Sequence, residues 1–183
     1  MDKMHAEQSV LVLVDYQARL MPAIYDSNRV TVNATLLAKA ARVLSIPVFG
    51  TEQNPSGLGP NMEQIGSECA RTITKMHFDA CKDGLLDALN GESAGRNQVV
   101  IAGCEAHVCM LQTALGLLRS GKQVWVVTSA SGSRRKDDHA TAMTRLAQAG
   151  ASIVTHEMAL FEWLDDCENP GFREVLKLIK KVG

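Results

Sequence analysis

Residues 98–113, QVVIAGCEAHVCMLQT, place an apolar run directly before a turn and a segment of helical period. The run at residues 98–102 is almost continuously apolar, as expected of a strand covered on both faces by helices. Gly103 permits a tight turn after it, and the helix predicted over residues 107–120 stops at Gly121, a typical C-terminal signal. This stretch therefore predicts one strand–turn–helix unit of a parallel α/β sheet.

The same alternation of apolar runs and helical periods extends over the rest of the chain. Further strands are predicted at residues 10–14, 47–51, 71–74, 123–128 and 151–154, and further helices at residues 30–44, 83–89, 137–149 and 171–181. Such alternation favours a parallel sheet joined by right-handed crossovers. No repeat or interdomain linker interrupts it, so we expect residues 1–183 to form a single domain.

The composition argues against several classes of protein and of partner. The chain has 183 residues, 46% of them hydrophobic, and a formal net charge of −1, which gives no electrostatic attraction for nucleic acid. No apolar run reaches the roughly 18 residues of a membrane span, and the first residues lack the apolar core of a signal peptide. We therefore expect a cytoplasmic protein that acts on a small-molecule substrate, with no nucleic acid and no membrane partner. The five cysteines have no regular spacing, as expected of reduced thiols: Cys69, Cys81, Cys104, Cys109 and Cys167.

The two cysteines, the glutamate and the histidine within residues 104–109 admit four interpretations. Zinc ligands usually come as two short pairs from separate segments, and only one candidate group is present here. Redox pairs have the spacing Cys-x-x-Cys, whereas Cys104 and Cys109 have four residues between them. Cys109 can instead be a small buried residue of a core helix, or a nucleophile whose thiolate is stabilised by the N–H groups and dipole of the helix start. The residues alone leave these last two interpretations open.

Two charged residues stand directly after predicted strands. In open α/β sheets, ligands bind beyond the carboxyl ends of the strands, near the point where the strand order reverses. Asp15 follows the all-apolar run VLVLV, where desolvation of a carboxylate suits it to act as a general base. Lys75 follows RTIT in the same way and can balance the negative charges of Asp15 and a thiolate. The alternative interpretations are a capping aspartate and a surface lysine.

Three separate motifs agree with one family. The segments LVLVDYQARL (11–20), KMHFDAC (75–81) and IAGCEAHVCMLQTAL (101–115) resemble, in order and spacing, the three catalytic segments of the isochorismatase-like cysteine hydrolases. That superfamily includes nicotinamidases and N-carbamoylsarcosine amidohydrolase. TEQNPSGLGP at residues 51–60 and GCEAHVCMLQTALGLL at residues 103–118 are similar to its isochorismatase domain-containing subgroup.

The resemblance implies a catalytic triad of Asp15, Lys75 and Cys109. In the family's mechanism the aspartate takes the thiol proton, the lysine holds and polarises the pair, and the cysteine attacks an amide-type carbonyl to form a thioester. The resemblance also implies a non-proline cis peptide bond at Cys104–Glu105. The backbone N–H groups of Glu105 and Cys109 would then form the oxyanion hole.

The resemblance further implies a fold and a set of pocket positions. The fold is a three-layer α-β-α sandwich, Rossmann-like, with a six-stranded parallel sheet in the order 3-2-1-4-5-6. Residues next to the three motifs are the expected substrate contacts: Gln17, Leu20, Glu52, Gln53, Phe78 and His107.

The departures from the family's pattern restrict the reaction. Nicotinamidases carry an Asp-x-His pair and a further histidine for a metal, whereas TEQNPSGLG at residues 51–59 contains no histidine. We therefore expect no metal and no cofactor, and hydrolysis of a small amide or other C–N bond. The alternatives are a non-catalytic binding protein and a redox-sensing thiol, with Cys104 or Cys81 resolving an oxidised Cys109.

An apolar segment near the C-terminus predicts self-association. ALFEWLDDC at residues 159–167 places Leu160, Phe161, Trp163 and Leu164 close together, more apolar surface than one short helix normally buries. Members of the resembled family are usually dimers or larger, so we expect a homodimer or a larger homo-oligomer.

Overall fold

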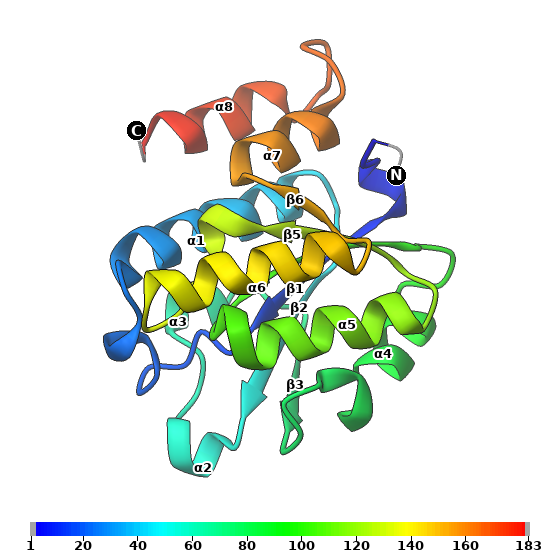
Figure 1. Ribbon diagram of the computed structural model, residues 1–183. Helices are drawn as coiled ribbons and strands as arrows, with labels where there is room; N and C mark the ends of the chain where they lie inside the picture. Colours follow the sequence, from blue (N-terminus) through cyan, green and yellow to red (C-terminus); the bar gives the residue numbers. More distant parts are fainter. Residues whose placement is uncertain (1–2, 182–183) are drawn as a thin grey trace.

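Six parallel strands form the centre of the molecule (Figure 1). The structure is a computed structural model that describes residues 3–181. The strands are β1 (Ser9–Val14), β2 (Val48–Gln53), β3 (Arg71–Lys75), β4 (Gln98–Gly103), β5 (Gln123–Val127) and β6 (Ser152–Val154). Their order across the sheet is β3-β2-β1-β4-β5-β6, with every neighbouring pair parallel. This confirms the predicted fold class and strand order.

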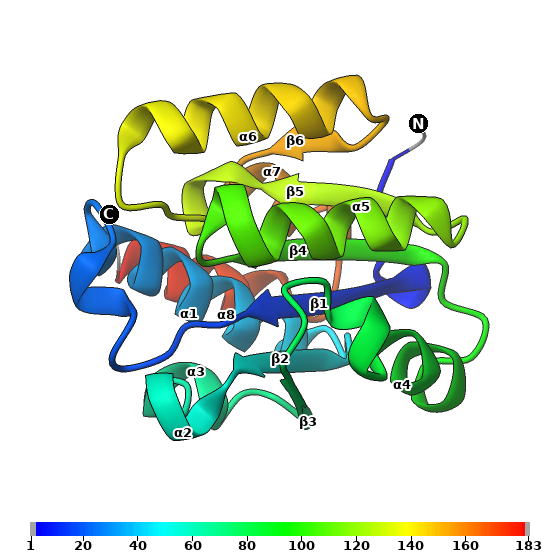
Figure 2. The same ribbon diagram turned by 60° about the horizontal axis from the view of Figure 1, so that its bottom comes forward.

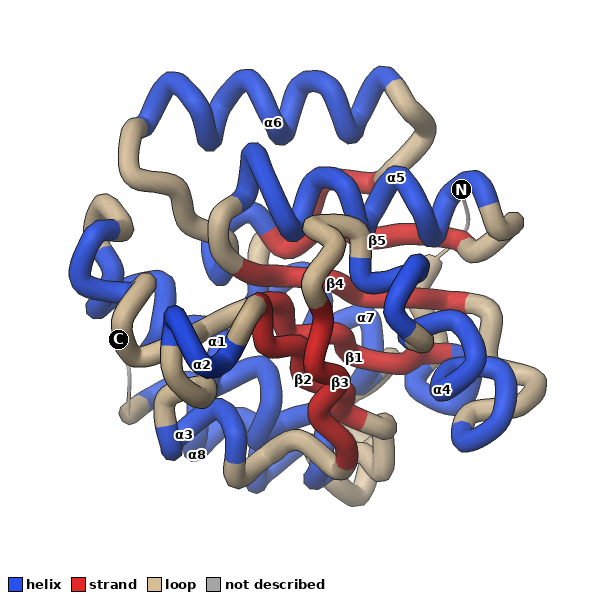
Figure 3. Tube along the Cα trace, turned by 90° about the horizontal axis from the view of Figure 1, so that it is seen from below, coloured by secondary structure: helices blue, strands red, loops and turns tan. Residues whose placement is uncertain are grey.

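Helices cover both faces of the sheet (Figure 2). One face carries α4 (Leu85–Glu92), α5 (Leu111–Arg119) and α6 (Lys136–Gln148). The other carries α1 (Ser27–Val43), the short α3 (Glu63–Gly66), α7 (His156–Leu164) and α8 (Phe172–Lys180), with α8 packed on α1. The short helix α2 (Pro55–Leu58) follows β2, and 3-10 turns form at Ala6–Gln8, Met21–Ala23, Ala80–Asp83 and Thr128–Ala130. Figure 3 shows the sheet enclosed between these two layers.

Strand β1 shows why the central strands are continuously apolar. Leu11 and Leu13 belong to the apolar cluster under α1, whereas Val10, Val12 and Val14 belong to the cluster under α5. Successive side chains of a strand point to opposite faces, so a strand between two helix layers buries all of them. Each of these five side chains is at most 1% exposed.

Two predicted helices differ from those observed. The helix predicted over residues 107–120 is divided into a π-helical turn, Ala106–Met110, and the α-helix α5. Cys109 therefore lies in a π-turn before the helix and not in the first turn of an α-helix. The helix predicted over residues 83–89 begins later, at Leu85, because the Asp79 side chain accepts a hydrogen bond from Cys81 N and caps a separate 3-10 turn.

The apolar segment expected at a subunit interface is mostly part of the protein's own core. Leu160, Trp163 and Leu164 are at most 2% exposed, and Trp163 Nε1 donates a hydrogen bond to Ser9 Oγ at 3.0 Å. The basis of the oligomer prediction is therefore wrong for these three residues, because α7 packs on the sheet and hides them. Phe161 alone of the four is exposed, at 45%.

Within residues 3–181, no helix is both long enough and apolar enough to cross a bilayer.

Gly103 is the position where the packing of the sheet tolerates no side chain. A Cβ at this residue would lie 2.4 Å from Val14 O and 2.5 Å from Val14 Cβ. We therefore expect Gly103→Ala to separate the ends of β1 and β4 and to lower the free energy of unfolding by about 1–3 kcal/mol. Urea unfolding followed by circular dichroism measures this change.

Gly91→Ala is the matched control, because Gly91 lies in α4 and a Cβ there meets no atom within 4 Å. Alanine in a helix should be neutral or stabilising by up to about 1 kcal/mol. Equal unfolding midpoints for Gly103→Ala and the unmodified protein would contradict the prediction.

Candidate active site

The site forms where the chain leaves two adjacent strands. β1 and β4 are neighbours in register, with Val14 opposite Gly103, and their crossovers lie on opposite sides of the sheet. Asp15 follows β1 with a left-handed backbone, φ 54°, and the cis peptide bond Cys104–Glu105 follows β4, as the family resemblance implied. Gly103 has no side chain, so its backbone packs directly against Val14. The two loops therefore begin side by side.

Asp15 is fully buried and forms an ion pair with a fully buried lysine. Lys75 Nζ lies 2.7 Å from Asp15 Oδ2, and both side chains are 0% exposed. The hydroxyl of Thr51 donates a hydrogen bond of 2.6 Å to Asp15 Oδ1. Oδ2 has no conventional hydrogen bond within residues 3–181 besides this ion-pair contact, which makes it the oxygen more available to a proton.

Gln53 connects the ion pair to the cysteine. Lys75 Nζ donates a hydrogen bond of 2.7 Å to Gln53 Oε1, and Cys109 Sγ lies 3.9 Å from the same oxygen. Gln53 Nε2 donates to Met76 O at 2.8 Å, which fixes the direction of the amide. Lys75 and Cys109 thus share one amide oxygen, and Asp15 joins them through its ion pair with Lys75.

Cys109 is 7% exposed, and its thiol is protonated at neutral pH. Burial, followed by the negative charge of Asp15, raises the pKa of Cys109 to about 12, while the ammonium of Lys75 lowers it in part. The sequence had suggested that a helix start would stabilise a thiolate. That expectation is wrong for the resting site, because desolvation and the carboxylate outweigh the lysine.

Three expected substrate contacts lie apart from the cysteine or are engaged elsewhere. Gln17 Nε2 donates to Gln53 O at 3.0 Å and to Gly59 O at 2.6 Å, and its Oε1 accepts from Gln53 N, so its amide braces the loop. Glu52 points to the other face of β2, where Oε1 accepts a 2.8 Å hydrogen bond from Asn61 N. Leu20 packs against the apolar cluster under α1.

Of the other three expected contacts, Gln53 joins Lys75 to Cys109 as described above, Phe78 lies on a loop and His107 lies in the π-turn. Phe78 is 50% exposed on the loop after β3, two residues beyond Met76. His107 Nδ1 lies 3.0 Å from Ser133 Oγ, and its Nε2 lies 3.9 Å from Asp138 Oδ2. His107 therefore contacts the loop before α6 and the start of that helix.

Thr51 is a site residue that the sequence reasoning missed. It is fully buried, stands opposite Val14 in the parallel register and binds the Asp15 carboxylate. A signal was available, because Thr51 is the last residue of the strand predicted at 47–51. Parallel neighbours end at the same edge, so a polar residue there faces the residue after β1.

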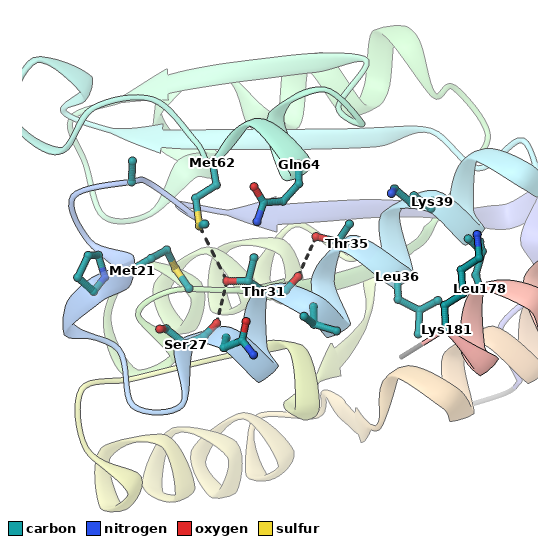
Figure 4. A pocket seen from close by; sticks show the side chains of 14 residues that line it. Met21, Ser27, Thr31, Thr35, Leu36, Lys39, Met62, Gln64, Leu178 and Lys181 are labelled. Atoms are coloured by element: carbon teal, nitrogen blue, oxygen red, sulfur yellow. Dashed lines mark hydrogen bonds between the residues drawn. The ribbon is translucent and has the colours of Figure 1, made fainter. Parts of the chain in front are cut away.

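A cavity away from Cys109 lies along α1. It measures about 610 Å³ and opens along α1, lined by Met21, Leu36 and Met62 among others, without any triad residue (Figure 4). The hydroxyls inside it are used by the helix itself, since Thr31 Oγ1 donates to Ser27 O and Thr35 Oγ1 to Thr31 O. This cavity presents no chemistry of the kind that surrounds Cys109.

Within residues 3–181, no three His, Cys, Asp or Glu side chains are grouped as ligands for a metal ion.

Comparison with known proteins identifies the family. Residues 9–158 match the isochorismatase domain. This chain belongs to the isochorismatase family. The family membership identifies an isochorismatase-like hydrolase scaffold, in agreement with the resemblance of the three motifs.

The isochorismatase-family relatives cover almost the whole chain. Isochorismatase domain-containing protein 2A of Mus musculus is 36% identical over 178 residues, 96% of this chain and 84% of the relative. Isochorismatase domain-containing protein 2 of Homo sapiens is 38% identical over 176 residues, 94% of this chain and 83% of the relative.

Solved structures of the family share the fold. The MAR1 ribonuclease from Caenorhabditis elegans is 33% identical, with a TM-score of 0.91 over 98% of this chain and 93% of that protein. The YcaC gene product from Escherichia coli is 24% identical, also with a TM-score of 0.91, over 100% of this chain and 93% of that protein.

The charges around the thiol predict opposite effects of two substitutions. Asp15→Asn removes a cause that raises the pKa of Cys109, and Lys75→Met removes one that lowers it. Alkylation of Cys109 by iodoacetamide, followed by mass spectrometry from pH 7 to 11, should therefore accelerate in Asp15→Asn and slow in Lys75→Met. Each unit of pKa change alters the rate at a given pH by about tenfold.

The exposed Cys167 serves as the internal reference for reagent and pH in every sample. Circular dichroism establishes that each variant is folded before rates are compared. Shifts of the Cys109 profile in the same direction for both variants would contradict the assignment of charges.

Proposed function

We propose that this protein is a cysteine hydrolase that cleaves a small amide or other C–N bond through a thioester intermediate. The observation that carries the proposal is the buried ion pair of Asp15 and Lys75, 2.7 Å apart, with Gln53 joining its ammonium to the cysteine. Burying a charge pair costs free energy of desolvation. Buried ionisable groups are therefore concentrated at functional sites.

In the proposed reaction Asp15 is the general base. Its Oδ2 takes the proton of the Cys109 thiol while the sulfur attacks the substrate carbonyl, and the ammonium of Lys75 stabilises the negative charge during the transfer. The C–N bond then breaks, the amine leaves with the proton from Asp15, and a thioester remains. Water activated by Asp15 hydrolyses the thioester, which releases the acid and restores the thiol.

The raised pKa of Cys109 supports this order of events. A thiol with a pKa of about 12 is protonated at neutral pH, so proton transfer accompanies the attack and does not precede it. The protonated thiol is then the resting form of the proposed nucleophile. Desolvation also raises the nucleophilicity that the sulfur gains when the proton moves.

The turn before the cysteine supports the proposed oxyanion hole. The backbone N–H of Glu105 follows the cis bond and has no hydrogen-bond acceptor within residues 3–181. Together with the N–H of Cys109 it would bind the oxyanion of the tetrahedral intermediate. Two such donors commonly supply several kcal/mol, about 3–4 kcal/mol for one of them.

The redox alternative is less well supported than hydrolysis. Burial raises the pKa of Cys104 far above its ordinary value and that of Cys81 to about 12. A resolving cysteine acts as a thiolate, and neither residue is one at neutral pH. Both thiols are free in the structure.

RNA cleavage is a second candidate function, because the Caenorhabditis elegans relative at 33% identity is described as a ribonuclease. The formal net charge of −1 gives no general attraction for a polyanion. Incubation of the purified protein and of Cys109→Ala with a labelled single-stranded RNA separates the two functions. Cleavage that persists in the variant would assign any RNA hydrolysis to another site or to a contaminant.

The amide hydrolysis predicts the effects of two substitutions on turnover. Against a panel of small carboxamides, Cys109→Ala should lose at least about 10⁴-fold in rate, because the nucleophile is gone. Thr51→Val keeps the volume but removes the hydrogen bond to Asp15 Oδ1, so we expect a loss of about tenfold or more.

Cys81→Ser is the matched control, because Cys81 is half-buried and contacts Thr113 O and not the triad. Its activity should equal that of the unmodified protein. Turnover that survives Cys109→Ala would show that the proposed nucleophile is wrong, and loss in Cys81→Ser would favour the redox alternative.

We also propose that the protein is at least a dimer. Met76 and Phe78, 67% and 50% exposed, place apolar side chains on the loop after β3. Apolar side chains exposed next to each other mark contact surfaces. Light scattering at micromolar concentration should give at least twice the monomer mass, and Phe78→Asp should lower it. A monomer mass for the unmodified protein would contradict the proposal.

A further inference from the structure

The loop at residues 131–134 runs beside the turn that leads to Cys109. Gly132 N donates to Gly103 O at 3.1 Å, and Ala106 N donates to Gly132 O at 2.7 Å. Cys104 and Gly132 form a parallel bridge. These backbone contacts fix residue 134 next to the turn, although it is far from that turn in sequence.

One edge of the Arg134 side chain is held by that turn. The backbone N and the Nε of Arg134 both donate to Glu105 Oε2, at 3.2 Å and 2.9 Å. The Glu105 side chain is 11% exposed and that of Arg134 is 60% exposed, so the carboxylate anchors the guanidinium from inside. The two hydrogen bonds to Glu105 therefore restrict the position of the Arg134 side chain.

The other edge of the guanidinium is unused. Neither Nη group of Arg134 has a hydrogen-bond acceptor within residues 3–181. The nearby acidic group on α6, Asp138, lies against His107 instead. An Arg fork with two parallel N–H donors matches a carboxylate, which it binds with two hydrogen bonds.

Glu105 links this fork to the proposed reaction. Its backbone N–H is a proposed oxyanion donor, and its side chain carries Arg134. A substrate whose scissile carbonyl accepts from the Glu105 N–H would therefore bind to the residue whose side chain also holds the Arg134 guanidinium. We propose that Arg134 binds substrate and selects small amides that carry a carboxylate, an inference that rests on the proposed function.

Two alkylating reagents of the same size test this selection. Iodoacetate and iodoacetamide both transfer a two-carbon group: the sulfur of Cys109 forms an S–C bond, the C–I bond breaks, and iodide leaves. Only iodoacetate carries a carboxylate. The ratio of the two rates at Cys109, divided by the same ratio at the exposed Cys167, measures binding of the carboxylate.

We expect Arg134→Gln to lower the normalised ratio about tenfold, because it removes the fork but keeps a polar side chain. Arg134→Lys, which keeps the charge without the fork, should lower it less. The matched control is Arg135→Gln, which removes the same charge from the next residue and should leave the ratio unchanged. Circular dichroism establishes that each variant is folded.

The outcomes separate this inference from the proposed function. An unchanged ratio in Arg134→Gln, or an equal fall in Arg135→Gln, would overturn the selection by Arg134 even if iodoacetamide labels Cys109. No labelling of Cys109 by either reagent at any pH would overturn the proposed nucleophile, and the inference with it.

Discussion

The ion pair of Asp15 and Lys75 is the interaction on which the rest of the site depends. Both side chains are fully buried, and removal of one partner from such a pair typically costs about 3–5 kcal/mol because the other charge is left unpaired. The structure compensates for the lost water with two neutral groups, the Thr51 hydroxyl on the carboxylate and the Gln53 carbonyl on the ammonium. Thr51 and Gln53, near the end of β2, therefore stabilise the charges of Asp15 after β1 and of Lys75 on β3.

The same compensation places the sulfur. The hydrogen bond from Gln53 Nε2 to Met76 O orients the side-chain carbonyl of Gln53 toward Lys75. The Gln17 amide bonds both the backbone N and the backbone O of Gln53. Cys109 Sγ lies 3.9 Å from the same side-chain carbonyl oxygen. Burial, followed by the negative charge of Asp15, raises the pKa of its thiol, so the sulfur adds no charge to the buried ion pair.

Much of the fold and the positions of the three proposed catalytic residues could be predicted from the sequence, because Asp15 and the turn before Cys109 each follow an apolar run and Lys75 follows a predicted strand. Such runs mark buried strands, and their carboxyl ends meet at one edge. The family resemblance places Gln53 and Glu52 among the expected substrate contacts, but their hydrogen bonds with Lys75 and Asn61 could not be predicted, because these depend on strand pairing. Only pairing with β3, where Gln53 stands opposite Lys75, keeps them extended and sends them to opposite faces.

Arg134 and the π-turn escaped prediction for a related reason. The basic run that contains Arg134 reads as a solvated surface, and the carboxylate that anchors it comes from a distant segment, at Glu105. The π-turn Ala106–Met110 likewise involves a tertiary contact, the hydrogen bond from Ala106 N to Gly132 O. Local periodicity reports neither of these contacts.

The lysine of the site is carried by an edge strand of the sheet. β3 stands at the edge, pairs only with β2, and has three of its five residues exposed. Edge strands open in local fluctuations that cost less free energy than global unfolding. When β3 frays, Lys75 leaves, and Asp15 stays behind in a core that cannot hold an unpaired charge. We therefore expect mild denaturant or heat to displace Lys75 before the four inner strands unfold, so that the site is lost before the fold.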